Sequence, residues 1–333
     1  MNAVPHLSNQ NLYWTQFNGL SLRCPSCGAS LGTTRQDVPV FETAITCARC
    51  GFSMQHDKGI WLALAPQRAT HYKKFMDEYQ TVRAAEGRGS PEANFYLSLP
   101  FRDTTGNNQA QWNIRAKTFR YIERELLGVI DQKRKGLDIL DLGAGNGWLS
   151  YRLSALGHRP VAVDLLINDT DGLGAASHYL QKLEKLFPRF QAELDHLPFE
   201  SEQFDCVIFN ASFHYSESYA KTLAEAIRCL RKGGFVIIAD SPWYSKEESG
   251  RLMLRERRSS FERQFGFASD GLASQEFLTD RRLRQLEKLF GIRWEIHNPN
   301  YGLRWAMRPL IARLRNKREP STFRIYVAEV PTS

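Results

Sequence analysis

Four cysteines near the N-terminus form two pairs, Cys24 with Cys27 and Cys47 with Cys50, in the pattern C-x2-C-x19-C-x2-C. Two such knuckles can bring four thiolates together in the tetrahedral arrangement that zinc prefers. A glycine follows each pair, as suits a tight turn whose amides point at sulfur. We predict one zinc ion bound by Cys24, Cys27, Cys47 and Cys50. Because protein ligands fill all four positions, this ion is expected to be structural.

A second candidate site is a glycine-rich turn in the middle of the chain. The segment Asp138 to Leu149, DILDLGAGNGWL, indicates a buried strand that ends near Asp141 and turns into a helix. Glycine there permits positive φ and lets a ligand approach the backbone. Asp164 ends the next expected strand, where a Rossmann-like fold places a carboxylate that accepts hydrogen bonds from ribose hydroxyls. The spacing G-x-G-x-G differs from the dinucleotide pattern G-x-G-x-x-G, so we expect a nucleoside ligand without phosphates.

Several segments together resemble the class I S-adenosylmethionine-dependent methyltransferases, and within them the ubiquinone-type group. Asp141 to Gly147 is similar to the first motif of that class. Glu193 to Phe199, followed by Phe204 to Ile208, resembles the adenine-contact and fourth-strand motifs of the group. Leu230 to Gly234 resembles its L-K-P-G-G turn, with lysine in place of the usual proline. The match covers about residues 112–240 and implies S-adenosylmethionine as the cofactor.

The resemblance also implies roles for single residues. Asp141 and the glycine turn would hold the methionine end of the cofactor, and Asp164 the ribose. Glu193 stands where the group usually has an aspartate that contacts the adenine amino group, and Asp195 is the alternative for that contact. Asn210, at the end of the fourth strand, would lie beside the sulfonium, or it is simply a strand-end turn residue. The implied cofactor-binding residues are Asp141, Gly143, Gly145, Asn146, Gly147, Asp164, Glu193, Asp195 and Asn210.

The candidate catalytic residues are His214 and Asn210. The sulfonium methyl group is already activated, so the enzyme mainly has to align a nucleophile and exclude water. The segment NASFHY, residues 210–215, is not the N-P-P-Y type sequence expected for exocyclic amine methylation. His214 can accept a proton from a hydroxyl or an acidic carbon, since its unperturbed pKa lies near neutrality. The alternative is that His214 is a loop residue that shapes the pocket.

Strands that alternate with helices must position these residues. This order predicts an α/β fold, a doubly wound Rossmann-like methyltransferase sheet with right-handed, mainly parallel βαβ units. Strands are expected at 138–142, 160–165, 204–210 and 235–240, and helices at 149–156, 175–186 and 218–230. A helix at 112–130 precedes the first strand, and two Arg-rich helical segments and a final β-like run at 323–330 follow the last.

We divide the chain into four parts. They are a zinc ribbon (20–65), a linker and lid (66–111), a class I methyltransferase domain (112–245), and an Arg-rich helical C-terminal extension with a terminal strand (246–333). Tyr96, Trp112 and Arg115 precede the first strand, where they could cover the cofactor and supply a cation for its methionine carboxylate. The alternative for Trp112 is that it starts an amphipathic helix packed on the sheet.

Length and composition place limits on the protein class. With 333 residues, the chain exceeds one compact core, so two domains or one enlarged domain are expected. The sequence has neither a signal-like start nor an apolar run of roughly 18 residues, so we expect a cytoplasmic protein. The net charge is +8, with arginines concentrated after residue 250. They form either solvated helix faces or an anion-binding surface.

Three functions remain open. We favour methyl transfer to a small-molecule or lipid-like acceptor, and the alternative is a ribosomal or transfer RNA methyltransferase, which the ribbon and the basic surplus favour. No base-stacking or phosphate-clamp module is recognisable, so we expect only weak nucleic-acid binding. A non-catalytic binding protein is disfavoured by the intact Asp141, glycine turn and Asp164. The segment 301–318 could lie on an anionic membrane surface, but we expect it to pack on its own domain. The oligomeric state stays open.

A ribbon ahead of a methyltransferase resembles two known arrangements. One is the group of bacterial 23S ribosomal RNA guanine methyltransferases with an N-terminal zinc ribbon, and the other is the small zinc-ribbon activator subunit of eukaryotic and archaeal methyltransferases, fused in cis. This chain departs from the first in its regular second knuckle and its long Arg-rich C-terminal region. We therefore do not assign it to that family.

Overall fold

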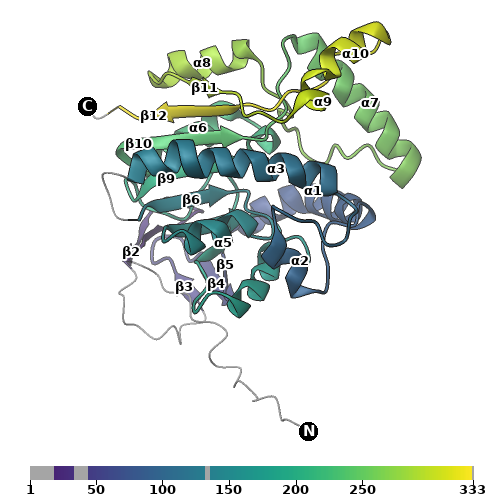
Figure 1. Cartoon of the computed structure of the whole chain (residues 1–333). Coiled ribbons are helices and arrows are strands. Elements are labelled where there is room, and N and C mark those ends of the chain that lie inside the picture. Colours follow the sequence, from purple (N-terminus) through teal and green to yellow (C-terminus); the bar gives the residue numbers. More distant parts are fainter. Residues whose placement is uncertain (1–18, 34–43, 132–135, 332–333) are drawn as a thin grey trace.

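The computed structural model describes residues 19–33, 44–131 and 136–331 (Figure 1). Within these residues, one mixed sheet has ten strands in the order β11-β12-β10-β9-β6-β7-β8-β5-β4-β3, and β1 and β2 form a separate hairpin. The strands are β1 Ser21–Arg23, β2 Ser30–Thr33, β3 Ala44–Thr46, β4 Ser53–Asp57, β5 Ile60–Leu62, β6 Asp138–Leu142, β7 Arg159–Asp164, β8 Arg189–Gln191, β9 Phe204–Asn210, β10 Leu230–Ala239, β11 Glu295–His297 and β12 Ile325–Glu329.

Helices connect and cover these strands. They are α1 Pro66–Ala85, α2 Ala93–Ser98, α3 Gln109–Tyr121, α4 Gly128–Asp131, α5 Trp148–Ala155, α6 Tyr219–Cys229, α7 Glu247–Phe265, α8 Asp280–Phe290, α9 Leu303–Ala306 and α10 Arg308–Leu314. A π-helical turn, η2 Ile122–Leu127, joins α3 to α4, and two 3₁₀ helices are η3 Leu173–Gln181 and η4 Phe213–Tyr215. Local sequence sets several of these ends. For example, the Thr279 side chain accepts a hydrogen bond from the Arg282 amide at the start of α8, and Gly291 ends that helix at φ +64°.

The centre of the sheet is buried on both faces. Strands β7, β6, β9 and β10 run parallel in that order. Leu140 and Leu142 belong to one core cluster, with residues of α6 and α8, whereas Ile139 belongs to a second cluster, with residues of α3 and α5. Alternate residues of one strand thus serve two helical layers, as continuous apolar runs in parallel sheets allow. The predicted doubly wound, Rossmann-like fold is confirmed.

The segment after β7 differs from the prediction. We expected an α-helix at 175–186, but the chain forms the shorter 3₁₀ helix η3. Leu173, Ala176 and Tyr179 are all buried and lie three residues apart. A 3₁₀ helix has three residues per turn, so these side chains share one face and can reach the core together. The sequence analysis also missed β8, whose three residues are too few for a recognisable pattern.

The N-terminal ribbon is joined to the central sheet. Strand β5 pairs in parallel with β8, so that Trp61 lies opposite Phe190. The Arg23 amide also donates a hydrogen bond to the Pro198 carbonyl at 3.1 Å. Residues 34–43 of the predicted ribbon lie outside the described residues. The described part of the ribbon therefore extends the methyltransferase sheet instead of standing apart from it.

The C-terminal extension returns to the other edge of the sheet. Strand β12 pairs antiparallel with β10, and β11 pairs antiparallel with β12. In α9 and α10, Leu303 and Leu314 are 80% and 76% exposed. Only part of the segment 301–318, which was expected to pack on its own domain, does so. Trp305, for example, stacks on Phe323. Among the described helices, none is both long and apolar enough to cross a bilayer.

Candidate functional site

A cavity opens at the carboxyl ends of β6, β7 and β9, where parallel sheets bind ligands. It encloses about 880 Å³ of space that no atom fills, part of it open to solvent. Helix α1 contributes Phe75, Tyr79 and Arg83 to its wall, and α3 contributes Trp112 and Arg115. The wall includes the sequence-predicted residues Asp141, Gly143, Gly145, Asn146, Asp164 and Asn210.

The glycine turn between β6 and α5 leaves no room for larger side chains. Gly143 has φ +76°, and a Cβ atom there would lie 2.2 Å from the Cβ of Ser212. Gly147 is the residue before α5, with φ +75°, and a Cβ there would meet Phe187 at 2.9 Å. It lies behind the turn rather than among the residues that line the cavity. Backbone geometry and packing therefore require glycine at both positions.

Two carboxyl groups meet at this edge. Asp141 is 1% exposed and accepts a hydrogen bond from the Ser150 hydroxyl at 2.7 Å, and burial raises its pKa to about 7. Asp164 accepts hydrogen bonds from the amides of Gly145 and Leu166, each at 2.8 Å, and burial raises its pKa to about 6. Each carboxylate oxygen has a second lone pair, so Asp164 can still accept hydrogen bonds from a ligand.

Asn210 is the third predicted residue on the wall. It ends β9, and its Oδ1 atom is buried without a hydrogen-bond partner among the described residues. Buried amide oxygens are normally paired, so this atom is suited to bind a ligand that enters the cavity. The neighbouring Ser212 instead donates its hydroxyl to the Leu142 carbonyl and supports the glycine turn.

Besides Gly147, two residues predicted to bind the cofactor are not on the cavity wall. Glu193 forms an ion pair with Arg68 at 2.6 Å, accepts a hydrogen bond from Tyr72, and lies 3.2 Å from His196. Asp195 accepts a hydrogen bond from the Thr222 hydroxyl. Both carboxylates thus have protein partners, and the adenine contact that the resemblance implies for Glu193 or Asp195 stays a prediction. Their neighbours on the wall are Ala192 and Leu194.

The α1 wall of the cavity carried no recognisable sequence motif. Arg83 pairs with Asp171 through two hydrogen bonds, at 2.5 and 3.0 Å. Tyr79 packs edge-on against Tyr215 at 5.6 Å between ring centroids. Of the three predicted lid residues, Trp112 and Arg115 line the cavity, with the Arg115 guanidinium 4.7 Å from the Trp112 ring. Tyr96 is fully buried and donates its hydroxyl to the Thr170 carbonyl at 2.7 Å.

His214 lies on a second cavity, which adjoins the first. The two share wall residues, including Phe75, Tyr79, Arg115 and Tyr215. The Nδ1 atom of His214 is 3.3 Å from the Ser241 hydroxyl. Burial lowers the His214 pKa to about 4, so the ring is neutral near pH 7 with a free nitrogen lone pair, but it is a weaker base than an exposed histidine.

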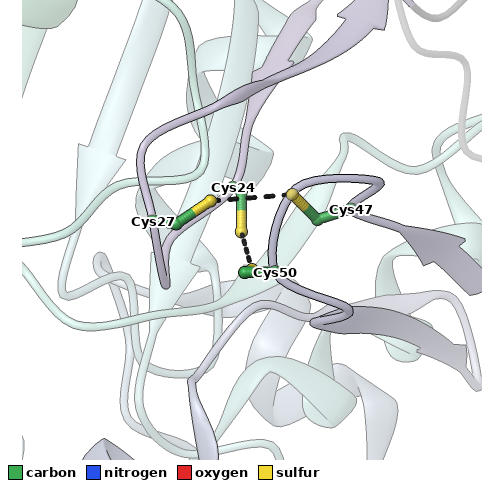
Figure 2. A group of neighbouring side chains, drawn as sticks. All are labelled: Cys24, Cys27, Cys47 and Cys50. Carbon is green, nitrogen blue, oxygen red and sulfur yellow. Dashed lines mark hydrogen bonds between the residues drawn. The ribbon is translucent and has the colours of Figure 1, made fainter.

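The four cysteines of the two knuckles converge, as Figure 2 shows. Their sulfur atoms all lie within 4.8 Å of one another, with 3.6 Å between Cys24 and Cys50 and between Cys27 and Cys47. Four thiolates about 2.3 Å from one tetrahedral zinc ion lie about 3.8 Å apart, so the cluster fits that ion. A hydrogen bond from the Cys50 amide is the main cause that lowers the Cys47 pKa to about 7, whereas burial raises the pKa of Cys24 to about 12.

Comparison with known proteins supports the Rossmann-like methyltransferase fold described above. Residues 140–238 match the family described as "Methyltransferase domain". The chain is 34% identical over 99 residues to the uncharacterized methyltransferase YodH of Bacillus subtilis, covering 30% of this chain and 41% of that protein. It is 29% identical over 196 residues to the phthiotriol/phenolphthiotriol dimycocerosates methyltransferase of Mycobacterium leprae, covering 56% and 67%.

Other relatives agree with the family. A ubiquinone/menaquinone biosynthesis C-methyltransferase of Rhizobium etli is 30% identical over 111 residues, covering 33% of this chain and 43% of that protein. A solved methyltransferase structure from Galdieria sulphuraria aligns with a TM-score of 0.50 at 12% identity, covering 77% of this chain and 99% of that one. The chain thus spans less than half the length of two of these curated relatives, and the structural likeness shows the fold.

Proposed function

We propose that this chain, which carries an S-adenosylmethionine-dependent methyltransferase domain over residues 140–238, transfers methyl groups from that cofactor to a small-molecule or lipid-like acceptor. One observation carries the proposal. Asp164 and Asn210 end β7 and β9, Asp141 is the penultimate residue of the parallel strand β6 between them, and all three line one cavity beside a turn that requires glycine. This arrangement suits a nucleoside with an amino-acid end and without phosphates.

Each polar residue of the cavity would bind a different part of the cofactor. Asp164 would accept hydrogen bonds from the ribose hydroxyls, and Asp141 with the glycine turn would hold the methionine end. Asn210 would orient the reacting centre through its unpartnered Oδ1. S-adenosylmethionine supplies a methyl group on a positively charged sulfur, ready for attack by a nucleophile. The side chains of Phe75 and Tyr79 would exclude water from that centre.

His214 would act on the acceptor rather than on the cofactor. Its ring is neutral near pH 7, because burial lowers its pKa to about 4. With Nδ1 protonated and donating to the Ser241 hydroxyl oxygen, Nε2 would be the atom that takes a proton from an acceptor hydroxyl or acidic carbon. An acceptor that needs no proton removal would leave His214 to shape the pocket only.

The choice of a small acceptor rests on the second cavity. Residues of α1, α3 and α7 line it, and aromatic side chains such as Phe75 and Phe261 stand among more numerous polar and charged ones, such as Arg88 and Glu276. Such a lining suits a small molecule that combines polar groups with an apolar or aromatic part. Two relatives are named for dimycocerosate and for ubiquinone/menaquinone methylation, which also favours a lipid-like acceptor.

The zinc ribbon would serve this site indirectly. We propose that Cys24, Cys27, Cys47 and Cys50 bind one structural zinc ion. The ribbon strand β5 holds β8, which leads directly to Ala192 and Leu194 on the cavity wall. The metal would thereby stabilise the part of the wall that the adenine ring is expected to face.

Radiolabelled methyl transfer tests the function. Purified protein and S-adenosylmethionine with a labelled methyl group are added to an extract of cells that lack the protein, and the extract is then separated into metabolites, lipids and RNA. We expect label in the metabolite or lipid fraction, and no label with an Asp141→Ala variant. Label confined to RNA and abolished in that variant would make RNA methylation the function. No incorporation in any fraction, despite cofactor binding, would contradict methyl transfer.

A further inference from the structure

Several buried polar atoms that lack partners gather on the second cavity, beside the proposed cofactor site. Among the described residues, these include Arg88 Nη1, Gln111 Oε1, Asp240 Oδ2 and Arg257 Nε. Buried polar atoms in native proteins are normally hydrogen-bonded. Since these four belong to separate elements but line one cavity, a bound polar molecule would satisfy them together.

The cations of this cavity are not all neutralised. Arg83 pairs with Asp171, Arg257 with Glu276, and Arg88 with Glu86 through its Nε atom. The Arg88 side chain is only 8% exposed, and its Nη1 remains free.

Arg115 differs from these three arginines. No hydrogen bond or ion pair is found for it within the described residues, and its contact is with the Trp112 ring. Partly buried and without a direct partner among the described residues, it offers up to five N–H donors.

The arginines also act on one another. Burial, together with the positive charges of Arg83 and Arg88, lowers the Arg115 pKa to about 10. The nearby Asp240 opposes this effect, but burial raises its own pKa, and its carboxylate accepts a hydrogen bond from Thr118 at 2.7 Å. An anion between Arg88 and Arg115 would relieve the repulsion of these guanidinium groups and receive charge-assisted hydrogen bonds.

We propose that the second cavity is the acceptor site and that it selects an anionic acceptor, whose carboxylate or phosphate group Arg88 and Arg115 bind. This inference rests on the proposed methyltransferase function. His214 lines the same cavity, so its Nε2 would meet the remainder of the acceptor. Gln111 and Asp240 would accept hydrogen bonds from hydroxyl or amino groups of the acceptor, and the aromatic wall would hold its apolar part.

The cofactor's own methionine carboxylate is the competing source of the anion. Arg115 lines both cavities, whereas Arg88 lines the second one. If Arg115 served the cofactor, its loss would weaken cofactor binding and leave the acceptor site intact. Experiments on the two arginines therefore distinguish the two sources.

Probe binding to the full chain saturated with S-adenosylhomocysteine tests the proposal. The probes are benzoate, phenyl phosphate and the neutral benzamide, titrated by calorimetry or NMR. We expect at least one anionic probe to bind at least tenfold more tightly than benzamide, a difference of about 1.4 kcal/mol. Arg88→Gln and Arg115→Gln should each abolish at least fivefold of this preference, and Arg88→Gln, which lies outside the cofactor cavity, should leave the affinity for S-adenosylhomocysteine within twofold.

Controls keep the outcomes separate. Arg120→Gln alters an arginine of the same helix α3 that lies outside the cavity lining, and it should change neither affinity. Thermal unfolding checks that each variant is folded, and the two arginines provide independent tests. Equal binding of all three probes, or a preference that survives both variants, would overturn the proposal. Loss of S-adenosylhomocysteine binding with retained anion preference in Arg115→Gln would assign that residue to the cofactor and equally overturn it. Failure of the wild-type chain to bind S-adenosylhomocysteine would instead contradict the proposed function.

Discussion

Arg83 on α1 donates hydrogen bonds from Nε and Nη2 to the two carboxylate oxygens of Asp171, at 2.5 and 3.0 Å. Asp171 belongs to the loop between β7 and η3, so this ion pair joins the N-terminal helix to the methyltransferase core. Both residues line the proposed cofactor cavity, and their side chains are only 16% and 10% exposed. The pair therefore holds α1 in place as one wall of the cavity.

Removing this ion pair is expected to weaken cofactor binding. In Arg83→Met, Asp171 loses its partner, and hydrogen bonds to charged groups contribute about 1.5 to 3 kcal/mol. We expect the affinity for S-adenosylhomocysteine to fall roughly tenfold in calorimetry, since α1 would no longer be fixed over the cavity. Lys73→Met on the same helix removes an ion pair with Asp77 that is mostly exposed, and it should have little effect. Equal affinities of the two variants would show that the Arg83 pair does not hold the wall.

Cofactor binding should depend on pH through Asp141. Burial raises its pKa to about 7 in the free protein, and the cationic end of the cofactor favours the ionised form. Affinity should therefore rise several-fold to about tenfold from pH 6 to pH 7. Asp141→Asn should remove this slope and leave a smaller one at lower pH from Asp164, whose pKa is about 6. Calorimetry at pH 5, 6 and 7 measures the pH dependence of the affinity in the wild type and in Asp141→Asn. A wild-type affinity that does not change with pH would contradict the role of Asp141 in cofactor binding.

The same carboxyl group has the opposite effect on the stability of the free protein. Its folded-state pKa of about 7 lies above the usual value of about 3.9 for an unfolded chain. The stabilisation by the bound proton is complete below about pH 4 and is lost as pH rises to 7. Denaturant titrations should show Asp141→Asn more stable than the wild type at pH 8, with the difference shrinking towards pH 4. A difference that stays constant with pH would exclude titration of Asp141 as its cause.

Zinc removal is expected to affect the cofactor site as well as the ribbon. We predict one zinc per chain by elemental analysis, and Cys47→Ser should lose it, because so small a unit depends on its metal. Since β5 pairs with β8 next to the cavity wall, this variant should also bind S-adenosylhomocysteine more weakly. Cys229→Ala, a buried cysteine of α6, should retain the zinc. Stoichiometric zinc in a variant without all four knuckle cysteines would refute the assignment.

RNA binding should be weak and strongly dependent on salt. Several arginines after residue 250 are engaged within the protein, as in the pairs of Arg282 with Glu247 and Arg318 with Glu256. Others on α7, such as Arg251 and Arg255, are exposed and attract polyanions. The logarithm of the affinity should fall with the logarithm of the salt concentration, with a slope of about −0.7 per contacted phosphate on single strands. Tight binding that persists at high salt would favour the RNA alternative.

The central strands and the glycine turn could be predicted because their signals are local. The apolar run before Asp141 and the closely spaced glycines after it specify a strand, a turn and a helix within about a dozen residues. The knuckle cysteines are similarly recognisable from spacing alone. The predicted strands at 138–142 and 204–210 match β6 and β9 residue for residue.

Partners distant in sequence could not be predicted. Arg68 binds Glu193 from 125 positions away, a contact that no motif around Glu193 indicates. The joining of β5 to β8 and the position of α1 over the cavity also arise only from tertiary packing. Arg88 and His214 line one cavity although His214 follows Arg88 by 126 positions in the sequence. No single-sequence pattern reports such contacts.

Calorimetric titration of the wild-type chain and Asp164→Ala with S-adenosylmethionine and S-adenosylhomocysteine tests the central claim most directly. We predict that the wild type binds both ligands and that the variant binds them roughly ten- to a hundredfold more weakly, because charged acceptors for two ribose hydroxyls are lost. Thermal unfolding of the variant serves as the folding control. Absence of binding by the folded wild type, or unchanged affinity in Asp164→Ala, would contradict the assignment of this cavity to the cofactor.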